Sequence, residues 1–218
     1  MSLTGNPPHL GHMAAIAAAI DGLARQNIRV NRVLVSLSAQ TYLEGKITPG
    51  KFALKNLARI HLLDKTIQEA ARRGMFRGVA VEFWNDQKGY EHQRPYGCDH
   101  PESYSRLSNP QLLQGEINAH RITPLPSGQH DVYLVAGSDL CRRMSNWPSI
   151  KNAIIVKRNE EDSVAYPPNP QESTRLFLDA LYPEFESFSS SAVQRGEQKL
   201  EPQELQDYFD VCAQEAKI

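Results

Sequence analysis

The chain has 218 residues, of which 40% are apolar and 22% charged, a composition that supports a packed core and argues against intrinsic disorder. Lys and Arg number 24 against 25 Asp and Glu, and the resulting net charge of −1 is unlike that of a general nucleic-acid binder. Three cysteines without a C-x-x-C spacing give no disulfide framework, and no apolar run is long enough to cross a membrane, so we expect a soluble cytoplasmic protein.

Two kinds of segment alternate along the chain: stretches with apolar residues at helical spacing, and short apolar runs typical of buried strands. In chain order we predict a helix over residues 12–26, a strand over 33–37, a helix over 51–73, strands over 79–84, 131–136 and 153–156, and helices over 171–181 and 201–216. This alternation predicts an α/β fold with a parallel sheet and helices on both faces. Ligands bind such sheets beyond the carboxyl ends of the strands, so the loops there are the first place to look for a site.

Residues 85–130 are polar and rich in Pro, Gly and His. We interpret them as a surface excursion, with one helix near 110–120, from a single domain that spans residues 1–218. His92, Cys98 and His100 lie in this excursion, but their spacing is not that of a standard zinc site and no fourth ligand is evident. We therefore predict no metal centre built from protein side chains.

The most informative motif is Asn6-Pro7-Pro8-His9-Leu10-Gly11-His12, at the start of the first helical pattern. Free backbone N–H groups and the positive end of the helix dipole attract phosphate at such a position. Gly11 lets a ligand approach the backbone, and the two imidazoles can donate hydrogen bonds to phosphoryl oxygens as charge develops. The alternative is a proline-rich turn whose histidines only cap the helix.

A second motif, Gly137-Ser138-Asp139, follows the third predicted strand, and Trp147 comes a little later. A carboxylate at the carboxyl end of a strand commonly accepts hydrogen bonds from a ribose or a base, and an indole can stack on an aromatic ring. The alternative is that Asp139 caps the next helix and Trp147 belongs to the core.

A third motif is the hydroxyl run Ser189-Ser190-Ser191 before a short helical stretch that carries Arg195. Hydroxyls at a helix start with a cation one turn later suit a phosphate chain, although a serine-rich helix cap is the commoner explanation. The turn Thr48-Pro49-Gly50-Lys51 adds a lysine that is uninformative by itself.

In this order the motifs resemble those of the H-x-G-H nucleotidyltransferase superfamily, most of all the bacterial nicotinate-nucleotide adenylyltransferases. The first motif looks like the family's N-P-x-H-x-G-H signature, the second resembles its G-A-D…W block, and residues 154–158 are similar to the strand and arginine that follow. The serine run resembles the start of the I-S-S-T-x-x-R motif, but Gln194 stands where the family has arginine and Arg195 is one residue late. The resemblance extends over nearly the whole chain except residues 85–130.

The resemblance implies a Rossmann-like fold and an enzyme of NAD biosynthesis that transfers the adenylyl group of ATP to nicotinate mononucleotide and releases pyrophosphate. It implies Mg²⁺ carried by the ATP phosphates, and ATP and a mononucleotide as partners, without nucleic acid or membrane. The implied catalytic residues are His9 and His12, the implied ATP contacts are Asn6, Gly11, Gly137, Asp139, Ser190, Ser191 and Arg195, and the implied acceptor contacts are Lys51 and Trp147.

Two alternatives stay open beside this reading. The N-P-x-H block is widely shared, so the acceptor could instead be nicotinamide mononucleotide or phosphopantetheine. The second alternative is a catalytically inactive nucleotide-binding protein with the same fold, because the chain departs from the family pattern at Gln194.

The beginning of the chain departs from the superfamily as well. A central strand of the sheet precedes the signature there, whereas Met1-Ser2-Leu3-Thr4-Gly5 cannot supply a strand of ordinary length, which needs about 5 to 6 residues. We expect the first strand to be short or missing. We also expect a truncated start, such that a chain extended upstream by a short apolar run would be more stable and bind ATP more tightly.

Overall fold

The computed structural model describes residues 1–38, 40–83, 131, 133–137, 152–157, 175–178, 182–185 and 187–217. The strands within these ranges form two groups. One has the order β1 (Ser2–Leu3), β2 (Arg32–Leu37), β3 (Ala80–Phe83), and the other has the order β4 (Leu134–Gly137), β5 (Ala153–Val156), β6 (Arg175–Leu178). All four pairings between neighbouring strands are parallel, as the alternation of elements predicted.

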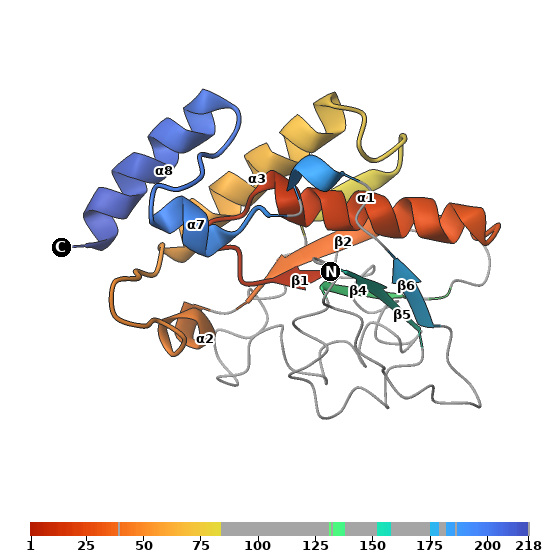
Figure 1. Cartoon of the computed structure of the whole chain (residues 1–218), viewed down its shortest axis with the longest axis horizontal. Helices are drawn as coiled ribbons and strands as arrows, with labels where there is room; N and C mark the ends of the chain where they lie inside the picture. Colours follow the sequence, from red (N-terminus) through yellow and green to blue (C-terminus); the bar gives the residue numbers. More distant parts are fainter. Residues whose placement is uncertain are drawn as a thin grey trace, which may run out of the picture.

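The helices in the described part of the chain follow the same alternation. They are α1 (Leu10–Arg25), α2 (Gln40–Glu44), α3 (Asn56–Arg72), α7 (Ser190–Gln194), α8 (Gln203–Ala216) and the 3₁₀ helix η4 (Pro183–Phe185). Figure 1 shows α1 and α3 against the strands, with α8 on the outer side of α3. No helix in these ranges is both long and apolar enough to cross a membrane.

Helix α1 is buried on more than one face, because it packs against both groups of strands. Met13 and Ile16 pack in a cluster with residues of β2, whereas Ala18 and Ala19 pack in another with residues of β4 and β5. The partly buried Met1 contacts both clusters. The small alanines let the helix approach the second group of strands closely, so α1 holds the two groups together.

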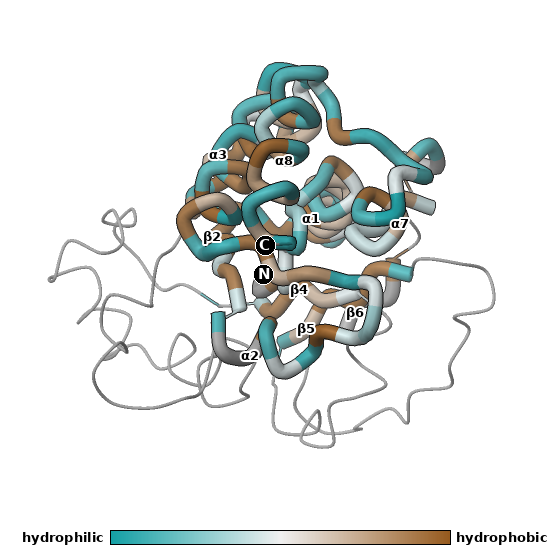
Figure 2. The backbone as a smooth tube through the Cα atoms, turned by 90° about the vertical axis from the view of Figure 1, so that its left-hand side faces the viewer, coloured by the Kyte–Doolittle hydropathy of each residue, from teal (hydrophilic) through white to brown (hydrophobic). Residues whose placement is uncertain are grey.

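Helix α8 covers α3 through a third apolar cluster. Leu205, Phe209 and Ala213 lie four residues apart, which places them on one face of the helix, and they pack with Leu62 of α3. Figure 2 shows hydrophobic positions as brown on α8 and on β5, which packs against α1. The expected helix over residues 201–216 is thus confirmed.

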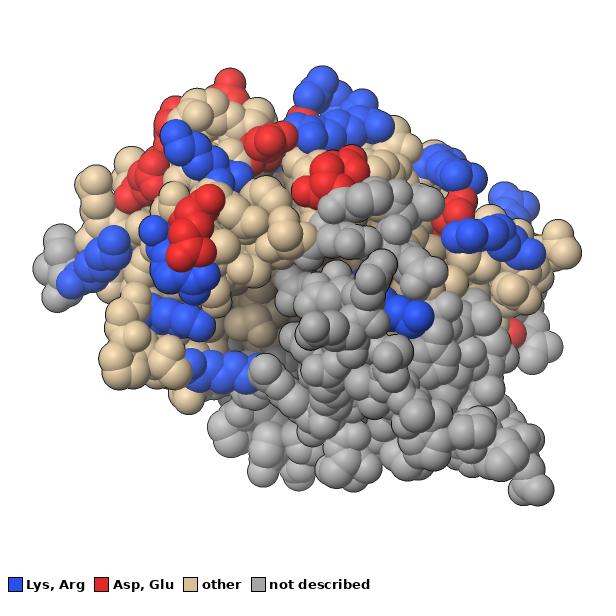
Figure 3. Space-filling model, viewed as in Figure 1, with Lys and Arg blue, Asp and Glu red and all other residues tan. Residues whose placement is uncertain are grey.

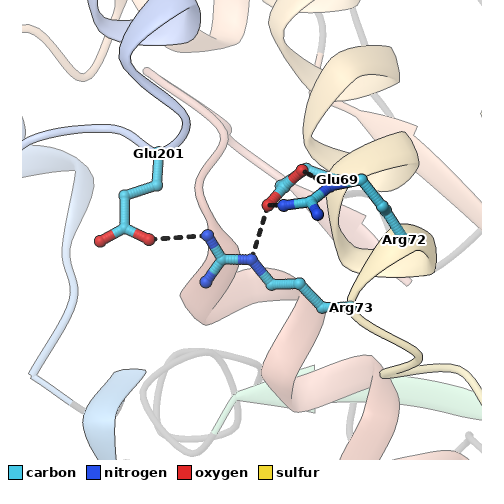
Figure 4. A network of polar contacts seen from close by, with 4 residues as sticks. All are labelled: Glu69, Arg72, Arg73 and Glu201. Carbon is cyan, nitrogen blue, oxygen red and sulfur yellow. Dashed lines mark hydrogen bonds and ion pairs between the residues drawn. The ribbon is translucent and has the colours of Figure 1, made fainter.

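An ionic network adds a polar link beside this apolar contact. The Glu69 carboxylate lies 2.7 Å from Arg72 and 2.7 Å from Arg73, and Arg73 also lies 2.7 Å from Glu201, just before α8 (Figure 4). Arg73 therefore joins the end of α3 to the start of α8.

The first strand is short but not missing. Ser2 pairs with Ser36 and Leu3 with Leu37, so β1 lies beside β2 in the sheet. The Met1 ammonium also donates a 2.7 Å hydrogen bond to the Leu34 carbonyl oxygen. The order of elements therefore places the Asn6–His12 motif directly after a strand of the sheet.

One predicted helix is wrong. Part of the segment expected as a helix over residues 171–181 is strand β6, in which Leu176 pairs with Ile154 and Phe177 with Ile155 of β5. The apolar run Leu176–Leu178 is too short for its period to separate helix from strand, and pairing with the fully buried β5 decides the outcome. Helix α3 also begins five residues later than expected, and α2 was not foreseen.

Candidate active site

The loop between β1 and α1 is held by the side chain of Asn6. Its amide nitrogen donates to the Phe52 carbonyl oxygen at 2.7 Å, and its amide oxygen accepts from the Leu54 N–H at 2.9 Å. Asn6 is only 7% exposed, so both bonds are shielded from water. The side chain thus pairs with the backbone of the 52–54 segment much as a neighbouring strand would.

Helix α7 holds the same loop from the other end of the sequence. Gln194 donates from its amide nitrogen to the carbonyl oxygens of Asn6, at 2.9 Å, and Phe52, at 3.1 Å. Ser190 donates from its hydroxyl to the Pro7 carbonyl oxygen at 2.8 Å. Three predicted segments, the histidine motif, the lysine turn and the serine run, are therefore brought together.

The two histidines occupy the start of α1 as expected. His9 is the N-cap residue, and its backbone N–H donates to Nδ1 of His12 at 3.2 Å. The two rings have centroids 3.8 Å apart, and the Phe188 ring lies 5.1 Å from that of His9. An Nδ1 atom that accepts carries no proton, so the neutral His12 ring carries its hydrogen on Nε2.

Burial separates these two imidazoles. His9 is 1% exposed, whereas His12 is partly exposed. The arrangement fits the capping interpretation of the motif, since His12 Nδ1 takes part in capping, and it places the N–H of the neutral ring on the opposite side, at Nε2. His12 is accordingly the imidazole that a ligand can reach.

The packing around position 11 requires a glycine, which the sequence did not reveal. A Cβ atom at this position would lie 3.0 Å from Nδ1 of His9 and 3.1 Å from the carbonyl oxygen of Phe185. The missing side chain therefore leaves room for the His9 ring and for η4.

Lys51 lies beside α7 at the edge of this assembly. Its ammonium donates to the Ser191 hydroxyl at 3.0 Å, while Phe52 next to it is buried. Figure 3 shows Lys and Arg side chains gathered over α7 and the connection between α2 and α3. An exposed ammonium group paired with a neutral hydroxyl keeps its charge available to an anion.

Arg195 does not join the other site residues. Its guanidinium makes two hydrogen bonds to the Glu197 carboxylate, at 2.5 and 2.6 Å, on the exposed end of α7. This hydrogen-bonded pair raises the pKa of Arg195 and lowers that of Glu197. Ser189 accepts from the Ala192 N–H at 3.1 Å, so the capping interpretation of the serine run holds for this residue.

Some predicted site residues lie elsewhere or outside the described ranges. Gly137 is the last residue of β4 and pairs with Val156. Asp139, Trp147 and the excursion with its histidines and cysteine fall outside the described residues. Within the described ranges no group of three His, Cys, Asp or Glu residues could hold a metal ion.

The contacts of Gln194 with the histidine loop could not be foreseen from the resemblance, in which Gln194 only stands at the position of the family arginine. A signal was present, because Ser190 and Gln194 are four residues apart and share a helix face, and Ser190 was already a candidate.

No family model and no curated protein sequence matches the chain. Among solved structures, the chain is similar to the Plasmodium falciparum nicotinic acid mononucleotide adenylyltransferase complexed with NaAD. The TM-score is 0.52 and the identity 14%, over 95% of this chain and 91% of that one. The likeness shows a shared Rossmann-like fold.

Proposed function

We propose that the chain transfers the adenylyl group of ATP to nicotinate mononucleotide, giving nicotinate adenine dinucleotide and pyrophosphate. The observation that carries the proposal is the joining of the loop that bears His12 to α7 and to the segment after Lys51. The shared fold with a nicotinic acid mononucleotide adenylyltransferase supports it.

In this reaction a phosphate oxygen of the mononucleotide attacks the α-phosphorus of MgATP. The new bond joins that oxygen to the α-phosphorus, and the bond from the α-phosphorus to the bridging oxygen breaks as pyrophosphate leaves. No covalent enzyme intermediate is required, so catalysis consists of positioning and of neutralising charge on the phosphoryl oxygens.

His12 is the residue we assign to that charge. Its Nε2–H donates to a phosphoryl oxygen, and the bond from the His9 N–H to Nδ1 holds the ring in this tautomer. His9, which is buried against His12 and Phe188, supports the ring from behind. A donor fixed before the reaction stabilises developing charge without the cost of reorganisation.

Lys51 and the Ser191 hydroxyl complete the proposed phosphate contacts, whereas the Ser190 hydroxyl donates to the Pro7 carbonyl oxygen and holds the loop. The Lys51 ammonium and the Ser191 hydroxyl are 3.0 Å apart, so one anion can meet both. Asp139 and Trp147 remain our proposed contacts for the nucleoside and the pyridine ring. We no longer assign Arg195 to the triphosphate, because its guanidinium is paired with Glu197.

The test is pyrophosphate release by the purified chain with MgATP and each of three acceptors: nicotinate mononucleotide, nicotinamide mononucleotide and phosphopantetheine. We expect the highest kcat/KM with nicotinate mononucleotide, by about 10²-fold or more, because donors aimed at a carboxylate reject the amide strongly. Equal values for the first two acceptors would refute the specificity. Absence of release with all three would refute the transferase assignment.

One observation favours a second candidate, a nucleotide-binding protein without transferase activity. The position of the family arginine is taken by Gln194, whose amide nitrogen is engaged with backbone carbonyls, and Arg195 is paired with Glu197. ATP binding measured by calorimetry together with an absence of pyrophosphate release would select this candidate.

A further inference from the structure

Arg59 of α3 is the largest of the fully buried side chains in the described part of the chain. One nitrogen of its guanidinium, Nη2, donates to two backbone carbonyl oxygens, that of Thr4 at 2.6 Å and that of Ser38 at 2.8 Å. Burying a guanidinium is costly, so a side chain of this kind in a core indicates a specific geometric requirement.

The two acceptors mark the places where neighbouring strands end. Thr4 directly follows β1 and Ser38 directly follows β2, so Arg59 links the carboxyl ends of both strands. At this edge the two strands are also joined by the hydrogen bond from the Ser38 N–H to the Leu3 carbonyl oxygen, at 2.9 Å.

This link matters because β1 is only two residues long. A strand of ordinary length, about 5 to 6 residues, fixes the direction of its following loop through its own ladder. Here the ladder is short, and the loop that begins at Thr4 leads within five residues to His9, the N-cap of α1. The Arg59 link replaces part of the missing ladder.

We propose that Arg59 is a positioning residue for the reaction: by holding the end of β1 on β2, it sets the place of the histidine loop relative to the substrate phosphates. This inference rests on the proposed function. Displacements of about 1 Å at a reacting centre can cost about 10²-fold in rate, so loss of the link should appear mainly in kcat.

The variants are Arg59→Lys and Arg59→Gln, which shorten the side chain and remove the fork of donors. The matched control is Thr66→Ala, also on α3 and also buried, which removes a 2.7 Å hydrogen bond to the Leu62 carbonyl oxygen away from the loop. Two measurements are made on each protein: hydrogen–deuterium exchange of peptides that cover residues 4–12, and kcat with KM for ATP.

We expect Arg59→Lys to speed exchange in residues 4–12 by about 10-fold or more, and to lower kcat by about 10- to 100-fold with KM for ATP within about threefold. Arg59→Gln should have the larger effect on both. Thr66→Ala should lower the melting temperature without changing either quantity by more than about twofold. Unchanged exchange and kcat in Arg59→Lys would overturn the inference.

The remaining outcomes are also decisive. If both Arg59 variants fail to fold while Thr66→Ala folds, Arg59 serves the whole fold and the positioning assignment is wrong. If the unaltered chain releases no pyrophosphate, the proposed function fails. Exchange in residues 4–12 then still decides whether Arg59 fixes the loop, so the two failures are distinguishable.

Discussion

The start of α1 places two imidazoles of different accessibility within 3.8 Å of each other. The buried one packs against Phe188, and the partly exposed one accepts a backbone hydrogen bond on one side. At the scale of single residues this difference predicts unequal effects of substitution. The exposed ring should control the rate, and the buried ring should also affect stability.

His12→Ala should lower kcat by about 10²-fold or more, because one preorganised donor to a developing charge contributes about that much. The melting temperature should fall by only a few degrees. The control is His61→Ala, which removes an exposed imidazole of α3 whose ring lies tilted against that of Tyr208, away from the site. A kcat of His12→Ala within twofold of the unaltered chain would contradict the role given to His12.

Gln194→Leu should destabilise the fold by about 1 to 3 kcal/mol, since it removes a donor from two carbonyl oxygens in the loop assembly. It should also reduce the rise in melting temperature that saturating ATP produces. Urea unfolding and thermal melts with ATP measure these effects. Gln203→Leu is the control, because the Gln203 amide pairs with Asp207 on the exposed face of α8. If both variants lose the same free energy of unfolding and the same ATP-induced rise in melting temperature, the loop contact is unimportant.

At the scale of elements, the Arg73 guanidinium that links α3 to the start of α8 is also bound by Glu69, a carboxylate with an unusual pKa. Hydrogen bonding to Arg72, and then to Arg73, lowers the pKa of Glu69 from 4.5 to about 2 against the opposing effect of burial. A carboxyl pKa that is depressed on folding stabilises the folded state above the unfolded pKa. This contribution is lost as the pH falls from about 4.5 towards 2.

Glu69→Gln should therefore lower the free energy of unfolding at pH 7 by about 1 to 3 kcal/mol, a range that allows for the solvent exposure of Arg72. The difference from the unaltered chain should shrink between pH 5 and pH 2. Urea titrations at several pH values measure it. Glu204→Gln, an exposed carboxylate on α8, is the control; a difference that stays constant down to pH 2 would exclude the ion pairs as the cause.

The contact between α1 and β6 depends on a glycine inside a helix. A Cβ atom on Gly22 would overlap the Leu178 side chain, so a larger residue here requires Leu178 to move. Helix propensity alone favours alanine by about 1 kcal/mol at such a position. The steric conflict is expected to outweigh it.

Gly22→Ala should accordingly destabilise the fold by about 1 to 3 kcal/mol. The double variant Gly22→Ala with Leu178→Ala should be more stable than the sum of the two single changes predicts, because the smaller side chain makes room for the new methyl group. Chemical denaturation of all four proteins gives the coupling energy. A stabilised Gly22→Ala variant would mean that propensity decides and the contact is loose.

At the scale of the whole molecule, long or fully buried elements could be predicted from the sequence more accurately than short ones. Helix α8 has 14 residues, and apolar residues such as Leu205 and Phe209 recur along one of its faces. Strand β5 is a continuous buried run, and its bounds match the expected 153–156. The two-residue β1 and the four-residue β6 depend on pairing with strands far along the chain, which no local pattern contains.

The candidate site was foreseen as motifs but not as contacts. The sequence pointed to His9, His12, Lys51 and the serine run, and the structure gathers them. The Gln194 bonds to Asn6 and Phe52, and those of Arg59 to two strand ends, join side chains to backbone atoms of distant segments. A backbone acceptor has no signature in the sequence, so these links required the fold.

The separation of the loop contacts has a consequence for biosynthesis. Ser190 and Gln194 reach back 183 and 188 residues to Pro7 and Asn6, so the histidine loop is held in place by a segment that is synthesised much later. Contacts this distant form slowly, after the entropy of a long loop has been overcome. A nascent chain that has exposed its histidine motif therefore still lacks the contacts with α7, and the proposed site should become complete only after α7 has been synthesised and has docked.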